Sequence, residues 1–72
     1  MDWRTFFGPR LTEVRERMGL SKSELARRIG TRHVAIVEFE KGRKFPSVET
    51  LVALAHVLEV STDWLLGLSD HR

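Results

Sequence analysis

Helix start and stop signals follow one another at short intervals along these 72 residues, and they constrain the fold more than any other feature. The clearest is the run SKSE, a capping box. In it the Ser21 hydroxyl accepts a hydrogen bond from the Glu24 backbone N–H, and the Glu24 carboxylate accepts one from the Ser21 N–H. Gly30, which favours a helix end, follows soon after. The helix that the box starts is therefore barely two turns long.

Similar signals predict a helix before this one. Apolar residues recur at spacings of three and four from Leu11 to Met18, and Gly19 follows as a stop. The start of this first helix stays open. It lies at Gly8-Pro9, since proline suits the first helical position, or near Asp2 with a bend at Pro9.

Two serines predict the last two helices. Ser47 is a good N-cap for a helix whose apolar stripe runs from Leu51 to Leu58. Ser61 caps a short helix at residues 64–66, which Gly67 closes. Both connections are short, as in a helical domain.

The stretch TRHVAIVEFEKG, residues 31–42, is rich in valine and isoleucine and on its own is typical of a buried strand. No partner strand is predicted, however, and a lone strand leaves its backbone groups unpaired. We therefore expect a helix over about Arg32–Lys41. One face of it carries Ile36, Phe39 and Glu40, and the other carries Val34, Val37 and Glu38. The prediction is an all-α chain of five helices in one domain, residues 1–72.

Composition excludes several classes of protein. The chain has no cysteine, which rules out disulfides and thiolate sites, and its three histidines have no metal-ligand spacing. No apolar run approaches the roughly 18 residues of a membrane helix, and the first ten residues do not resemble a signal peptide. No nucleophile or acid–base pair stands out. We expect a cytoplasmic protein that is not an enzyme and has no metal, cofactor or small-molecule substrate.

Charge is distributed unevenly along the chain. Residues 1–45 carry 11 Lys/Arg and 6 Asp/Glu, a net charge of +5, whereas residues 46–72 carry 1 Arg and 4 Asp/Glu, a net charge of −3. Such asymmetry favours a face that binds an anion, although chance clustering on a solvated surface would give the same totals.

Two short helices joined at Gly30 and followed by a basic loop form a helix-turn-helix pattern. From about residue 7 to 68 the sequence resembles the phage-repressor or Xre-type helix-turn-helix family. The shared markers are Arg15, Gly19-Leu20-Ser21, Leu25-Ala26, Gly30, Ile36, Glu40, Gly42, Pro46-Ser47 and the closing STDWLLG. The resemblance implies a five-helix, lambda-repressor-like domain. It also implies a homodimeric transcriptional regulator, a repressor, that inserts its third helix into the major groove of double-stranded DNA.

By position, the resemblance implies contacts to DNA. The base-facing residues would be Arg32, His33, Val34 and Glu38. The phosphate-facing residues would be Arg10, Lys22, Arg43 and Lys44. Their chemistry suits these roles: valine can pack on a thymine methyl, glutamate can accept from cytosine N4, and histidine can donate to guanine or phosphate. Lys and Arg bind phosphate without reading sequence.

The resemblance also implies a structural ion pair between Arg15 and Glu40. Two departures from the family pattern affect the backbone. Arg32 replaces the usual Ser or Thr cap of the third helix, so Thr31 is expected to take over the cap. Glu59 stands where Gly or Asn is common, so a strained turn is expected there.

An alternative stays open, in which the same scaffold is a protein-interaction module of the antitoxin or antirepressor-partner type. The outward valines favour it, since an apolar helix face can anchor an interface. For the dimer surface we expect the last helix, with Leu65, Leu66 and Leu68. The apolar cluster of Trp3, Phe6 and Phe7 is expected to cap the core instead.

Overall fold

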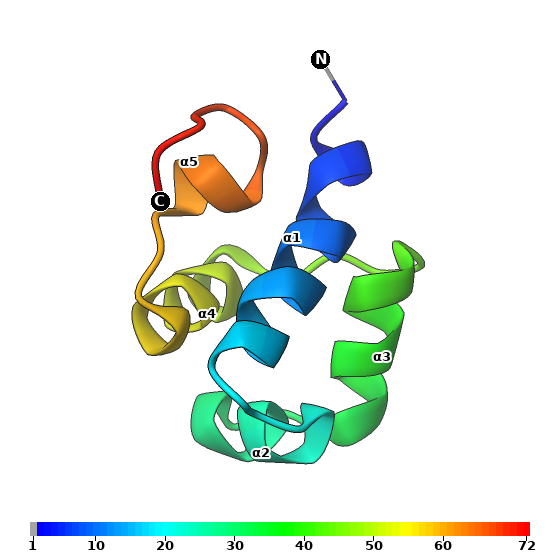
Figure 1. Cartoon of the computed structure of the whole chain (residues 1–72). Coiled ribbons are helices and arrows are strands. Elements are labelled where there is room, and N and C mark those ends of the chain that lie inside the picture. The colour runs from blue at the N-terminus through cyan, green and yellow to red at the C-terminus, as the bar shows by residue number, and fades with distance from the viewer. Residues whose placement is uncertain (1) are drawn as a thin grey trace.

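The computed structural model describes residues 2–72, and this part of the chain folds into five helices without a strand (Figure 1). The helices are α1 (Trp3–Arg17), α2 (Lys22–Ile29), α3 (His33–Lys41), α4 (Val48–Leu58) and α5 (Thr62–Leu65). The prediction of a five-helix, all-α fold is confirmed. Within residues 2–72, no helix has both the length and the apolar character needed to cross a bilayer.

Helix α1 begins near Asp2, the second of the two starts left open by the sequence, and it continues through Pro9. The Asp2 side chain caps it by accepting a hydrogen bond from the Arg4 backbone N–H at 3.0 Å. Gly8 has a packing role, because a Cβ there would lie 2.5 Å from the backbone oxygen of Glu40. Helices α1 and α3 therefore cross at a distance that only glycine permits at position 8.

The capping box of α2 forms as the sequence predicts, with N–H to oxygen distances of 3.0 and 2.9 Å between Ser21 and Glu24. These hydrogen bonds from Ser21 hold the pKa of Glu24 below its ordinary value. Gly30 then ends α2 at a φ of 75°. The expected Thr31 cap is wrong. The N-cap of α3 is Arg32, and no side chain caps this end.

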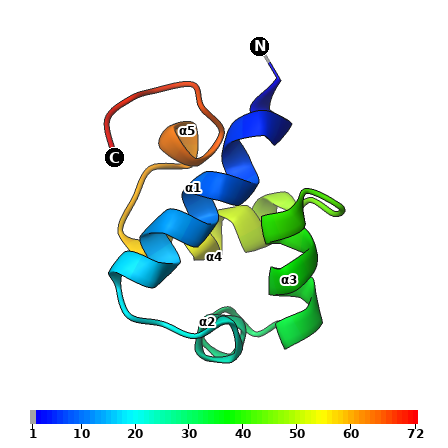
Figure 2. The same ribbon diagram turned by 45° about the vertical axis from the view of Figure 1, so that its right-hand side comes forward.

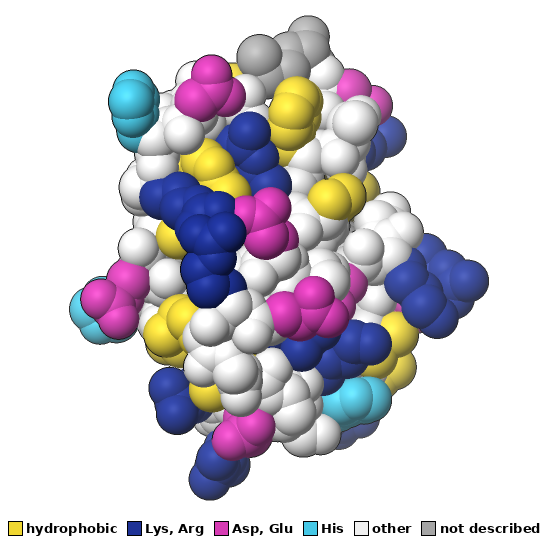
Figure 3. Space-filling model, viewed as in Figure 1, with side chains coloured by type: hydrophobic (Ala, Val, Ile, Leu, Met, Phe, Trp, Pro, Cys, Tyr) yellow, Lys and Arg dark blue, Asp and Glu magenta, His cyan; other side chains and the backbone are white. Residues whose placement is uncertain are grey.

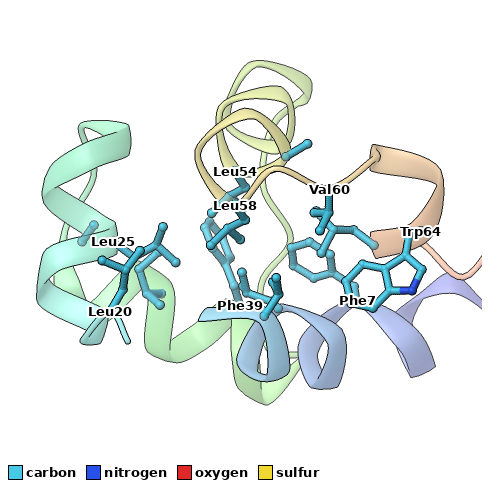
Figure 4. Packing of buried hydrophobic residues seen from close by; sticks show 14 residues of the cluster. Phe7, Leu20, Leu25, Phe39, Leu54, Leu58, Val60 and Trp64 are labelled. Atoms are coloured by element: carbon cyan, nitrogen blue, oxygen red, sulfur yellow. The ribbon is translucent and has the colours of Figure 1, made fainter. Parts of the chain in front are cut away.

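Residues 33–41 form a helix despite their β-branched content because tertiary burial outweighs local propensity. Ile36 and Phe39 of α3 are buried in the core. The Phe39 ring lies against the ring of Phe7 of α1, with centroids 6.3 Å apart, and Leu54 of α4 belongs to the same cluster (Figure 4). Every helix contributes to this one core. The buried apolar residues are Phe7, Leu11, Val14, Leu20, Leu25, Ala26, Ile36, Phe39, Leu54, Ala55, Leu58, Val60, Trp64 and Leu65.

An Arg15–Glu40 ion pair lies beside the core and joins α1 to α3. Arg15 donates from Nε to Glu40 Oε2 at 2.6 Å and from Nη2 to Oε1 at 3.3 Å. Its Nη1 donates to the Leu20 carbonyl at 2.8 Å. The two side chains are only 9% and 7% exposed, and the hydrogen bond to Glu40 raises the Arg15 pKa further. The pair fixes both helices and the turn after α1.

Glu59 ends α4 in the left-handed region, with φ 57° and ψ 44°. Among residues 2–72 it is the only non-glycine residue with positive φ. We expect Glu59→Gly to raise the free energy of unfolding by about 0.5–1 kcal/mol, because relief of the left-handed strain exceeds glycine's entropy cost. Urea denaturation of the two proteins measures this difference. A loss of stability in the variant would contradict it.

Candidate nucleic-acid interface

Helix α3 lies at the edge of the molecule in both ribbon views, with α2 next to it across a tight turn (Figure 1 and Figure 2). Its inner face is buried, whereas Arg32, His33 and Val34 are exposed at its start. Val34 is 57% exposed and stands next to the exposed His33. This outer face is open to a partner.

A hollow of about 560 Å³ lies between the turn before α3 and the loop after it. Four of the residues predicted to contact DNA line it together, namely Arg32, Val34, Glu38 and Lys44. The other lining residues are Gly30, Thr31 and Ala35. The fold thus gathers onto one surface residues that lie up to a dozen positions apart in the sequence.

Two further predicted residues stand at helix starts. His33 is the first residue of α3, and Lys22 is the first residue of α2. The first backbone N–H groups of a helix have no partner within it, and they carry partial positive charge. No side chain caps α3, so this end suits a phosphate oxygen.

The loop after α3 folds back onto the helix. The backbone N–H groups of Arg43 and Lys44 both donate to the Glu38 carbonyl, at 2.9 and 3.4 Å. Gly42 allows this reversal with a φ of 76°. The loop therefore holds two cations beside the hollow. In Figure 3, Lys and Arg side chains project on the side where Figure 1 places α3 and this loop.

The surroundings of the Glu38 side chain were not predicted from the sequence. Its side chain is only 24% exposed, and Arg43 Nη1 lies 3.7 Å from its Oε2. That oxygen is buried and accepts no hydrogen bond from residues 2–72. Helical periodicity places Glu38 on the outer face of α3. It does not describe the loop after α3, and it is this loop that positions Arg43 beside Glu38.

The structure separates Arg10 from the other predicted phosphate contacts. Its guanidinium donates to the carbonyl oxygens of Trp64 and Ser69, and it lies 3.7 Å from the Asp70 carboxylate. It also stacks over the Trp64 ring at 4.8 Å. The Arg10 side chain thus binds α5 and the C-terminal segment, and it does not belong to this surface.

Residues 11–65 match the protein-family model described as helix-turn-helix. The chain is 36% identical over 70 residues to y4dJ of Sinorhizobium fredii, an HTH-type transcriptional regulator. That match covers 97% of this chain and 91% of y4dJ. It is 33% identical over 63 residues to the HTH-type transcriptional regulator ImmR of Bacillus subtilis. That match covers 88% of this chain, which spans about half (50%) of ImmR.

Among solved structures, the chain is similar to the P22 c2 repressor protein in complex with a synthetic operator. The TM-score is 0.85 at 30% sequence identity, and the match covers 89% of this chain and 97% of that one. The similarity therefore extends over nearly the whole of both domains.

Proposed function

The chain belongs to the helix-turn-helix family, and from this premise we propose that it is a transcriptional repressor that binds double-stranded DNA with α3 in the major groove. The observation that carries the proposal is the single surface formed by Arg32, His33, Val34 and the Arg43-Lys44 loop around Glu38. The operator bound by the P22 c2 repressor supports it. A regulator works beside its DNA, so we place the protein in the cytoplasm.

The proposed contacts divide into two kinds. Val34 packs on a thymine methyl, Glu38 accepts from cytosine N4, and His33 donates to guanine or to a phosphate. The cations hold the protein on the backbone, with no sequence preference of their own. They are Lys22, Arg43 and Lys44, and we add Arg32, which the resemblance placed with the base-facing residues at the edge of α3. Because Arg32 and Lys44 line the hollow together with Val34 and Glu38, phosphate binding would also set the register of α3 in the groove.

We also propose that the regulator acts as a homodimer on paired half-sites. Leu65 is fully buried, so it is not available for an interface. Leu66 and Leu68 instead line an apolar groove of about 220 Å³ together with Trp3 and Phe7. The groove is thus lined by members of both apolar clusters that the sequence suggested, although Leu65 and Phe6 are not among them. Sedimentation of the protein with an operator-length duplex would test the proposal, since it predicts two chains per duplex.

The salt dependence of binding tests the proposed function. Four cations per protomer, each neutralising one phosphate, give a dimer eight contacts. At about 0.9 per contact, the logarithm of the affinity should fall with the logarithm of salt concentration at a slope of about −7 on a matched site. Fluorescence anisotropy over a salt series measures this slope. A value shallower than about −3 would contradict the proposed set of contacts.

A protein-interaction module is the second candidate, because the 57% exposure of Val34 would also suit an apolar interface. The two functions differ in their response to salt. Contacts to phosphate weaken steeply as salt rises, whereas an apolar contact does not.

A further inference from the structure

We propose that the Glu38 carboxylate determines whether Arg43 can contact a phosphate, and that the two side chains thereby couple base recognition to a phosphate contact. In the free protein the Glu38 carboxylate neutralises Arg43. When a cytosine amine binds the carboxylate, Arg43 is released to a phosphate. This inference rests on the proposed function, since it concerns how the same surface distinguishes a matched DNA site from an unmatched one.

The backbone holds the two groups together. The Glu38 carbonyl accepts hydrogen bonds from the N–H groups of Arg43 and Lys44, so the loop cannot move away from α3 without breaking both. This places Arg43 Nη1 at 3.7 Å from Glu38 Oε2, which is close enough for an ion pair but too long for a hydrogen bond. The Arg43 side chain is 66% exposed and can turn outward while the backbone stays fixed.

The Glu38 carboxylate is incompletely satisfied. Its Oε2 is buried and accepts no hydrogen bond from the described part of the chain, which is costly for an ionised oxygen. On α3 the hollow in front of it is lined by Val34 and Ala35, whose side chains cannot donate. Thr31, Arg32 and Lys44 also line the hollow, but none of them donates a hydrogen bond to Glu38 Oε2. Because the Glu38 side chain is still 24% exposed, a donor that enters the hollow from outside can reach the carboxylate and would gain a charge-assisted hydrogen bond.

Cytosine supplies the best such donor in the major groove. Its N4 amine has no acceptor beside it on the same base, whereas the adenine N6 amine is adjacent to N7, an acceptor that a carboxylate repels. Once the Glu38 carboxylate accepts a hydrogen bond from cytosine, it has a partner other than Arg43, and the Arg43 side chain can turn to a phosphate. On other sequences the carboxylate keeps Arg43 and repels the phosphates, so the pair penalises unmatched DNA.

The number of phosphate contacts should thus depend on sequence. On unmatched DNA only Lys22, Arg32 and Lys44 of each protomer contact phosphates, which predicts a salt slope of about −5 for a dimer. On a matched site Arg43 joins them, and the slope becomes about −7. A protein with independent cations would give the same slope on both kinds of DNA.

Salt titrations of binding to a duplex of random sequence test this coupling. Glu38→Gln keeps the size of the side chain and removes its charge, so Arg43 should be free on any DNA. We expect the slope to steepen by about 0.9 for each bound protomer and the affinity at 0.1 M salt to rise about eightfold per protomer. Arg43→Ala should leave the wild-type slope unchanged but cancel the increase in the Glu38→Gln background.

Asp63→Asn is the matched control, because it removes the same charge from α5, which lies away from α3 (Figure 1). It should not steepen the slope. The proposal is overturned if Glu38→Gln steepens the slope by less than 0.5 per protomer, or if Arg43→Ala reduces the slope equally in both backgrounds. Absence of salt-dependent binding by the wild type to any duplex would instead refute the proposed function, and the inference with it.

Discussion

Glu40→Ala is expected to lower the free energy of unfolding by about 3–5 kcal/mol, because it leaves the buried Arg15 guanidinium without its counter-ion. The loss is large for a domain of this size. At about 4 °C or more per kcal/mol, the melting temperature should fall by at least about 12 °C. Urea and thermal denaturation followed by circular dichroism measure both quantities.

Two controls separate this effect from a general loss of charge. Arg17→Ala removes an exposed ion pair with Glu13 on α1 and should cost less than about 1 kcal/mol. Replacing both partners, Arg15→Met with Glu40→Leu, should restore much of the stability, since no buried charge then remains. A loss below about 1 kcal/mol for Glu40→Ala would mean that the pair does not stabilise the fold.

Val34→Asp should weaken DNA binding by at least about 100-fold. It removes an apolar contact to a base and places a carboxylate where phosphates and base acceptors would face it. Folding should be unchanged, because Val34 is 57% exposed. Val52→Asp is the matched control, since Val52 is 55% exposed on α4, and this variant should bind DNA within about threefold of wild type.

The same variant distinguishes the two candidate functions. If α3 binds DNA, the residual affinity of Val34→Asp should collapse as salt is raised. If α3 binds a protein through its valines, Val34→Asp should weaken that complex with little dependence on salt. Equal DNA binding by Val34→Asp and wild type would remove α3 from the interface.

Local signals predicted most of the fold. Ser21, Ser47 and Ser61 each cap a helix as expected, because a cap depends on residues that are close in the sequence. For α1 the sequence left two local start signals open, and the helix begins at the Asp2 cap. Gly8-Pro9, the other start that the sequence offered, lies within α1, and the close passage of α3 explains the glycine at position 8. Thr31 was expected to cap α3 from its type alone, and it does not.

The candidate site was predictable to a lesser extent. Helical periodicity is sufficient to place Val34 on the outer face of α3. It could not bring Arg43 beside Glu38, because that contact depends on how the loop after α3 folds back. Nor could it reveal that Arg10 binds α5 and the C-terminal segment, which lie more than 50 residues away in sequence.

Selection from a pool of randomised duplexes at moderate salt, followed by sequencing of the recovered DNA, tests the central claim most directly. The account predicts an enriched, two-fold-symmetric site with thymine and cytosine at the positions that Val34 and Glu38 face. Recovery of no DNA above background would contradict it, and α3 would then be the surface to examine for a protein partner.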